Sequence, residues 1–206
     1  ADPKRRGFFA SLQFVTLIGG QLGALLVLFL IELSLGEAAL REWAWRLPFI
    51  LGAVFALTVL LFRHLMHETV GKDGKAPEAG SLRALAQHPR SMMTVVALSA
   101  AGALCLYAFT TYMQKFLVNT AGMSVPVASR VMIVATICFM LFQPLIGALS
   151  DRIGRRTCLL VFTGTMTVAA VPLLNALARA ESAGEALVLV LVILFILSFY
   201  TSVSGL

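Results

Sequence analysis

The last stretch of the chain, ALVLVLVILFILSFYTSVSGL at residues 186–206, contains no Asp, Glu, Lys, Arg or His. A helix needs about 20 such residues to cross the ~30 Å hydrocarbon core of a bilayer, so this stretch predicts a transmembrane helix. Five further uncharged runs precede it, at residues 7–31, 47–62, 91–114, 131–150 and 157–178. The second is short, but it reaches the required length if Arg46 and Arg63 snorkel to opposite surfaces. The sequence therefore predicts an all-α, polytopic membrane helical bundle with six transmembrane helices.

The composition agrees with this prediction. Of the 206 residues, 59% are hydrophobic and 13% are charged, whereas about a quarter of the residues of a soluble domain are charged. A soluble globular domain is therefore excluded, and the high apolar content also excludes a disordered chain. None of the six runs alternates polar and apolar residues as the strands of an outer-membrane barrel do. The three cysteines lack the spacing of metal ligands, and we expect no metal site.

The formal net charge of +6 indicates how the helices are oriented. If residues 1–7 are cytoplasmic, eleven basic residues fall in cytoplasmic segments and five in outer ones, as the positive-inside rule requires. The eleven are Lys4, Arg5, Arg6, Arg63, Lys72, Lys75, Arg83, Arg90, Arg152, Arg155 and Arg156. The five are Arg41, Arg46, Lys115, Arg130 and Arg179. The basic residues thus mark topology, and we expect no nucleic-acid partner, which would need a basic patch on a soluble module.

A polar stripe is predicted at the end of the third run. Tyr107, Thr111, Gln114 and Lys115 fall within a wedge of about 100° on a regular helix. The stripe would line a solute cavity, with Lys115 attracting an anion near the outer end. Alternatively, Tyr107 and Lys115 anchor the helix at the membrane interface, where aromatic and basic residues are common.

Two further polar residues are candidate ligands. Gln13 lies inside the first run, where its amide would either donate to a substrate carboxylate or bridge two helices. On the same run, Gly19 and Gly23 form a small-xxx-small pair that predicts close approach of another helix. Arg46 follows Trp43 and Trp45. It is either an anchor in an aromatic belt or a partner for a carboxylate, to which an arginine donates two parallel hydrogen bonds.

The stretch GALSDRIGRR at residues 147–156 joins the fourth and fifth runs. An acid at the C-terminal end of a helix opposes the helix dipole, so Asp151 requires another charge or a helix N-terminus to compensate it. We expect three nearby arginines to supply that compensation, with a glycine that permits a tight turn. Such a cluster would form a cytoplasmic latch; the alternative is a short basic loop with an incidental acid. The latch residues are Gly147, Asp151, Arg152, Gly154, Arg155 and Arg156.

This ten-residue stretch resembles the signature loop of the major facilitator superfamily, with matches at Gly147, Leu149, Asp151, Arg152, Gly154, Arg155 and Arg156. Residues 6–11, 17–21, 45–49 and 107–123 are similar to its metabolite:proton symporter branch. The resemblance implies a partial major-facilitator fold, an internal piece that corresponds to spans five to ten of twelve. Residues 1–64 would be the last two helices of the N-terminal bundle, 65–90 the central cytoplasmic linker, and 91–206 the first four helices of the C-terminal bundle.

The resemblance also implies a function. We expect a secondary active transporter of the cell inner membrane that carries an organic anion, 2-oxoglutarate or a related dicarboxylate, together with protons. Arg46 and Lys115 would attract the dianion, and Gln13, Tyr107, Thr111 and Gln114 would line its path. The proton gradient would supply the energy, with the lipid bilayer as the other partner and no cofactor. The alternatives are a zwitterionic osmolyte such as proline or betaine, or a monocarboxylate. We expect no enzyme, because no nucleophile has a base at the same depth.

Overall fold

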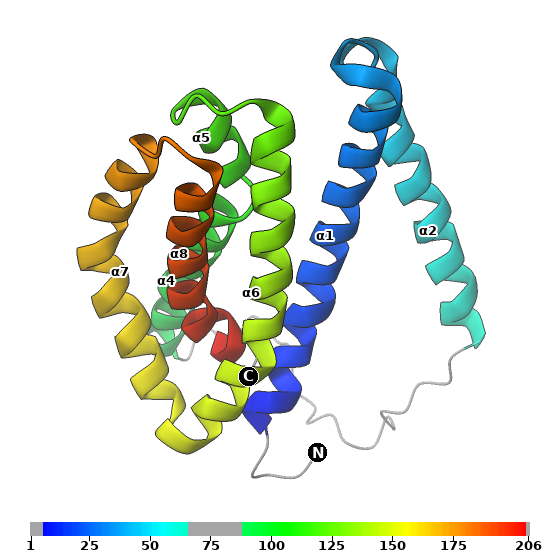
Figure 1. The fold of residues 1–206 in the computed structure, drawn as a ribbon. Helices are drawn as coiled ribbons and strands as arrows, with labels where there is room; N and C mark the ends of the chain where they lie inside the picture. Colours follow the sequence, from blue (N-terminus) through cyan, green and yellow to red (C-terminus); the bar gives the residue numbers. More distant parts are fainter. Residues whose placement is uncertain (1–5, 66–87, 205–206) are drawn as a thin grey trace. The chain divides into compact units, whose positions relative to one another are not determined.

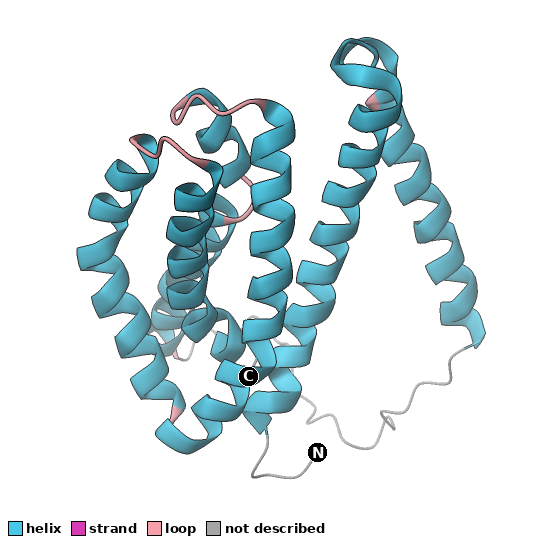
Figure 2. Cartoon of the chain, in the orientation of Figure 1, coloured by secondary structure: helices cyan, strands magenta, loops and turns pink. Residues whose placement is uncertain are grey.

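The structure is a computed structural model that describes residues 6–65 and 88–204. Residues 66–87, the greater part of the predicted linker 65–90, lie outside these described residues. Helices make up nearly all of the described chain, and it contains no strand (Figure 2). The helices, labelled in Figure 1, are α1 (Arg6–Ala39), α2 (Arg46–Leu65), α4 (Pro89–Phe109), α5 (Met113–Asn119), α6 (Val125–Ile153), α7 (Arg155–Ala178) and α8 (Ala183–Ser204), with a π-helical turn at Leu40–Ala44.

The six predicted transmembrane helices are confirmed. Among the described residues, six helical segments are long and apolar enough to cross a membrane, and each contains most or all of one predicted run. They are Gly7–Gly36, Leu40–Arg63, Pro89–Phe109, Val125–Ile153, Arg155–Ala178 and Ala183–Ser204. The first ends where Gly36 takes a φ of 79°, a conformation that glycine adopts without a steric penalty.

The third span is shorter than predicted. Helix α4 ends at Phe109, and a turn at residues 110–112 separates it from α5. In this turn the carbonyl oxygen of Tyr107 accepts the N–H groups of both Thr111 (3.0 Å) and Tyr112 (2.9 Å). Two threonines followed by tyrosine have low helix propensity, which is the local reason for the break. The constant 100° per residue assumed for the polar stripe therefore does not hold across this turn.

Short sequences before α6 and α8 favour the start of each helix. Helix α6 begins at Val125, six residues before the predicted run, with Pro126 in its first turn, where the fixed φ of proline favours a helix start. Helix α8 begins after Ser182, whose Oγ accepts the N–H of Glu185 at 3.2 Å. The Glu185 carboxylate in turn accepts the N–H of Glu181 at 3.2 Å, a variant of the capping box.

The chain divides into two compact units, residues 1–30 with 101–206 and residues 31–100. The first unit holds the main core, in which α8 lies beside both α6 and α7 (Figure 1). Its largest wholly buried side chains include Phe139, Met132, Leu117, Ile193 and Leu197. In the second unit, the apolar side chains of α2 are exposed, Phe49 and Leu61 among them. Exposed apolar side chains are favourable where the surroundings are lipid.

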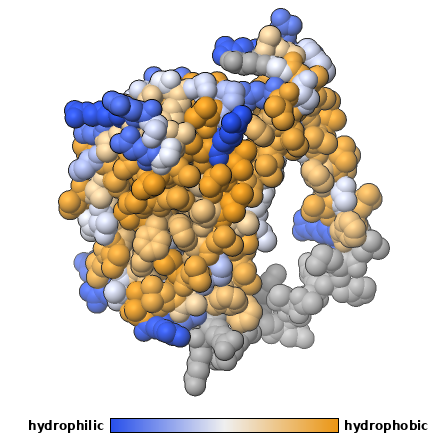
Figure 3. All heavy atoms as spheres, in the orientation of Figure 1, coloured by the Kyte–Doolittle hydropathy of each residue, from blue (hydrophilic) through white to orange (hydrophobic). Residues whose placement is uncertain are grey.

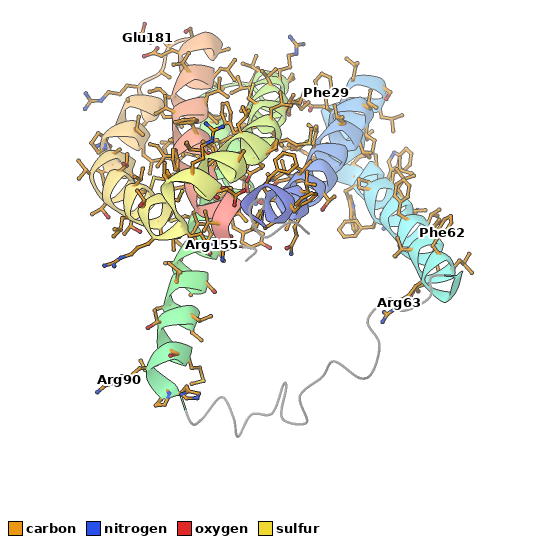
Figure 4. The ribbon with its side chains drawn as sticks, turned by 90° about the horizontal axis from the view of Figure 1, so that it is seen from below. Phe29, Phe62, Arg63, Arg90, Arg155 and Glu181 are labelled. Atoms are coloured by element: carbon orange, nitrogen blue, oxygen red, sulfur yellow. The ribbon has the colours of Figure 1, made fainter. Side chains whose placement is uncertain are left out.

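The surface supports the membrane assignment. In Figure 3 orange, hydrophobic side chains cover the middle of the α6, α7 and α8 group, and blue, hydrophilic ones collect at its ends. Figure 4 places Arg155 at the start of α7 and Glu181 just beyond its other end. It also places Arg63 in the last turn of α2 and Arg90 in the first turn of α4. The charged residues therefore border the apolar helices instead of interrupting them.

Substitution of one glycine tests the packing of the first unit. The ring of Tyr200 lies directly over Gly102, so a Cβ at position 102 would collide with it. We predict that Gly102→Ala lowers the unfolding temperature of the detergent-solubilised protein, since overpacking costs about 1–3 kcal/mol. Gly164→Ala in α7 is the control, because no atom of the described residues lies within 4 Å of the added Cβ. Thermal scans in which the two variants behave alike would contradict this packing.

Candidate functional site

The carboxylate of Asp151 caps the N-terminus of α1. The N–H of Gly7 donates to Oδ1 at 2.7 Å, and the N–H of Phe8 donates to Oδ2 at 3.1 Å. The first N–H groups of a helix have no partner within it, and they carry the positive end of the helix dipole. Each carboxylate oxygen therefore accepts one such N–H group, although Gly7 and Asp151 are 144 positions apart in the sequence.

This contact identifies which of two possible groups compensates Asp151. The arginines were expected to compensate this carboxylate, and the structure instead supplies a helix N-terminus. Arg152, Arg155 and Arg156 are exposed, and within the described part of the chain none of them forms an ion pair with Asp151. Their charges therefore face the surroundings where α6 ends and α7 begins.

Two glycines allow α1 and α6 to cross closely enough for this contact. A Cβ on Gly147 would lie 2.7 Å from the Oγ of Ser11 and 2.8 Å from the carbonyl oxygen of Gly7. A Cβ on Gly7 would lie 2.7 Å from the carbonyl oxygen of Gly147. Any side chain at either position would therefore push the two helices apart.

The serines at this crossing are satisfied within their own helices. The hydroxyl of Ser11 donates to the carbonyl of Phe8 at 2.6 Å, and that of Ser150 donates to the carbonyl of Gly147 at 2.7 Å. Sequence analysis missed Gly7, Ser11 and Ser150, although Gly7 and Ser11 have the same small-xxx-small spacing that predicted a contact at Gly19 and Gly23. Among the described residues, no atom lies within 4 Å of a Cβ added at Gly23; at Gly19 the nearest atom is Met140 Sδ, at 3.9 Å.

Gly154 forms the predicted tight turn between α6 and α7. Its φ of 86° lies in the region that residues with a side chain rarely adopt. The N–H of Gly154 donates to the carbonyl of Ser150 at 3.0 Å, which closes the last turn of α6. Helix α7 begins at the next residue, Arg155. The glycine therefore keeps the end of α6, with Asp151, close to the start of α7.

The residues of the predicted polar stripe lie mostly on the outer face of their unit. Tyr107 is 66% exposed, and Thr111 and Lys115 are also exposed. The opposite face of the same segment is buried and includes Phe109, Thr110, Met113 and Leu117. Gln114 differs, because it is half-buried and its Nε2 donates to the Oγ of Ser129 on α6 at 2.9 Å. Its amide therefore links α5 to α6.

The two remaining candidate ligands are also exposed. The side chain of Gln13 is exposed on α1. The guanidinium of Arg46 at the start of α2 lies over the ring of Trp45, 5.4 Å from its centroid. Trp45 in turn contacts Phe49 edge to face. This cation–π geometry is compatible with an anchor in an aromatic belt, and it fixes the direction in which the arginine points. Arg46 belongs to the second unit.

Sequence analysis missed a buried polar pair between α6 and α8. The hydroxyl of Thr201 donates to Oε1 of Gln143 at 2.9 Å, and both side chains are fully buried. The available signal was the spacing of polar residues on α6, where Ser129, Thr136, Gln143 and Ser150 recur every seven residues. Among the described residues, no group of three or more His, Cys, Asp or Glu residues is placed to hold a metal ion.

Comparison with known proteins identifies the family. Residues 1–205 match the family model of the Major Facilitator Superfamily. The chain is 54% identical to the alpha-ketoglutarate permease of Escherichia coli (strain K12), over 98% of this chain and 47% of that protein. It is 33% identical to the glycine betaine/proline/ectoine/pipecolic acid transporter OusA of Dickeya dadantii (strain 3937), over 82% of this chain and 36% of that protein.

A citrate-proton symporter of Klebsiella pneumoniae is 28% identical over 97% of this chain and 46% of that protein. The chain thus spans about half or less of the length of these relatives. Each is named for transport and none for a chemical reaction, which confirms the prediction that the chain is not an enzyme. No solved structure gives a significant match. The chain belongs to the major facilitator superfamily and is a multi-pass membrane protein, which in a bacterium lies in the inner membrane.

Proposed function

We propose that the chain is part of a secondary active transporter that moves 2-oxoglutarate or a related dicarboxylate across the membrane together with protons. The observation that carries the mechanism is the contact between the Asp151 carboxylate and the N–H groups of Gly7 and Phe8. The substrate class is supported by the likeness to a permease named for alpha-ketoglutarate. Residues 1–64 would belong to one bundle, 91–206 to the other, and 65–90 to the cytoplasmic linker between them.

The size of the Asp151 interaction suits a contact that is made and broken in each transport cycle. A charge at a helix N-terminus contributes about 0.3–1 kcal/mol, or up to ~2 kcal/mol where it is partly buried. Since about 1.4 kcal/mol changes an equilibrium tenfold, the contact would bias the bundle arrangement by roughly tenfold without locking it. Gly147 and Gly154 allow the close crossing and the turn that this contact needs, and Arg152, Arg155 and Arg156 hold this end at the cytoplasmic surface.

Binding would rest on two cations and four polar residues. Arg46 offers two parallel hydrogen bonds to a carboxylate, and Lys115 offers a compact charge to the other end of a dianion. The face that carries Tyr107, Thr111 and Lys115 is exposed and points away from the core of its unit. Gln114, which Ser129 positions, and Gln13 would complete the path. Residues that only anchor the helix at the membrane interface would be exposed in the same way, but their substitution would not change substrate affinity.

The proposed energy source is the proton gradient, with no cofactor. This is supported by a relative named as a citrate-proton symporter. A zwitterionic osmolyte is the second candidate substrate. It is favoured by relatives named as proline/betaine transporters, which are about 30% identical to this chain.

Substitution of the two cations tests the binding site. Arg46→Ala and Lys115→Ala in the full-length protein should each raise the apparent KM for labelled 2-oxoglutarate about 10- to 100-fold, since a hydrogen bond to a charged group contributes about 1.5–3 kcal/mol. Uptake into membrane vesicles measures this. Arg179→Ala, which removes another exposed outer cation, is the matched control and should leave the KM unchanged. An unchanged KM in both test variants would remove Arg46 and Lys115 from the binding site.

Competition between solutes tests the substrate class. Unlabelled 2-oxoglutarate and other dicarboxylates should inhibit the uptake of labelled 2-oxoglutarate, because two carboxylates are needed to engage two cations. Proline, glycine betaine and monocarboxylates should inhibit it at least tenfold less well. Stronger inhibition by the zwitterions would favour the osmolyte alternative.

Substitution of Asp151 separates its role from binding. Asp151→Asn keeps an oxygen acceptor of the same size but removes the charge that the α1 dipole attracts. We predict a fall in maximal uptake rate of about tenfold, with the KM and the equilibrium affinity for 2-oxoglutarate within about twofold, given the magnitude of helix-end charge interactions. Parallel measurements of uptake and equilibrium binding decide this. Equal losses of rate and affinity would contradict the latch.

A further inference from the structure

Helix α6 carries four buried polar side chains at intervals of seven residues: Ser129, Thr136, Gln143 and Ser150, with exposed fractions of 4%, 3%, 0% and 2%. A seven-residue step drifts by only about 20° on an α-helix, so these side chains follow one slowly turning face. Away from water, each polar group has to find its partner within the protein. Ser129 is linked to α5 and Gln143 to α8. Ser150 lies at the crossing with α1.

The pair at Gln143 is the most deeply placed of these links. Thr201 Oγ1 donates to Gln143 Oε1 at 2.9 Å, and Gln143 Nε2 donates to the carbonyl of Phe139 at 3.4 Å. Neither side chain is exposed to any degree. Loss of the threonine hydroxyl would leave a buried amide oxygen without its interhelical partner, which is unfavourable in an apolar interior. The pair thus fixes the position of α6 against α8 at one level.

The next residue, Pro144, weakens the helix at that same level. Proline has no N–H to donate to the carbonyl of Met140, and its ring crowds that carbonyl, so helices bend at such positions. Figure 1 shows the last turns of α6 leaving the line of the helix above them. The segment beyond the bend, residues 145–153, includes both Gly147 and Asp151. The Gln143–Thr201 pair therefore lies immediately before the segment that contacts α1.

We propose that Gln143 and Thr201 are positioning residues of the transport cycle. They hold the start of the segment after Pro144 against α8, so that Asp151 meets the N–H groups of Gly7 and Phe8. The role in the cycle rests on the proposed function. The positioning itself does not, because it is a property of the α1, α6 and α8 contacts. Thr201 acts on Asp151 through the backbone of α6 from Gln143 onward, two helical turns away.

Hydrogen exchange reports this contact directly. The amides of Gly7 and Phe8 would exchange fast in a helix with a free N-terminus, because no carbonyl of their own helix accepts them. The Asp151 carboxylate protects them. We predict that Thr201→Val, which replaces the hydroxyl by a methyl group, speeds exchange at these two amides at least threefold in the full-length protein in nanodiscs. Mass spectrometry of a peptide that contains both amides measures this, with Asp151→Asn as the positive control.

Two variants serve as matched controls. Thr201→Ser keeps the hydroxyl and should restore protection to within twofold of the wild type. Ser202→Ala removes the neighbouring hydroxyl, which is equally buried but has no hydrogen-bond partner among the described residues, and it should leave exchange unchanged. Wild-type exchange at Gly7 and Phe8 in Thr201→Val would overturn the proposal. Exchange that rises uniformly along α6 and α8 would overturn it too, since that result indicates general loss of packing.

Uptake measurements separate this proposal from the proposed function. Thr201→Val should lower the maximal rate about threefold or more, with the KM within twofold, and should have no further effect in an Asp151→Asn background. If the two substitutions lowered the maximal rate additively, Thr201 would not act through Asp151. If the wild type carries no 2-oxoglutarate, the proposed function fails, while the exchange results still decide whether Thr201 positions Asp151.

Discussion

A carboxylate at the end of one helix satisfies two unpaired N–H groups at the start of another, and the crossing of α1 and α6 depends on that interaction. Asp151 can reach Gly7 and Phe8 only because Gly147 allows the helices to cross closely. Gly154 then turns the chain at once into α7. An acid at a helix C-terminus is unfavourable by itself, because it opposes the dipole of that helix. The contact with the N-terminus of α1 compensates this cost and joins the two helices.

The sequence predicted those features that are encoded locally. Uncharged runs are continuous in sequence, so the six spans could be identified without knowledge of their neighbours. The need of Asp151 for a compensating group followed from its place at a helix end. Its partner could not be predicted, because Gly7 lies 144 positions away and no periodicity links the two. The turn after Phe109 was not predicted, because the third span was identified from its lack of charged residues. That criterion does not show where the helical hydrogen-bond pattern is interrupted.

The candidate binding residues were harder to judge for a different reason. A polar side chain in an apolar run has the same sequence signature whether it binds a solute, links two helices or anchors a helix at the interface. The structure distinguishes Gln114, which donates to Ser129, from Lys115, which is exposed. It also shows that Gln143, for which the sequence predicted no role, is wholly buried and accepts a hydrogen bond from Thr201. For Arg46, contact with Trp45 describes its orientation, and only a substrate assay reports its role.

The central claim is that the Asp151 contact holds the start of α1 against the end of α6. Spin labels at the exposed positions Phe9 and Ile153 would measure the distance between these two ends in the full-length protein. We predict a dominant short-distance population in the wild type and a larger long-distance population in Asp151→Asn, since a charge at a helix N-terminus contributes about 0.3–1 kcal/mol, or up to ~2 kcal/mol where it is partly buried. Identical distance distributions in the two proteins would show that the contact does not hold the helices together.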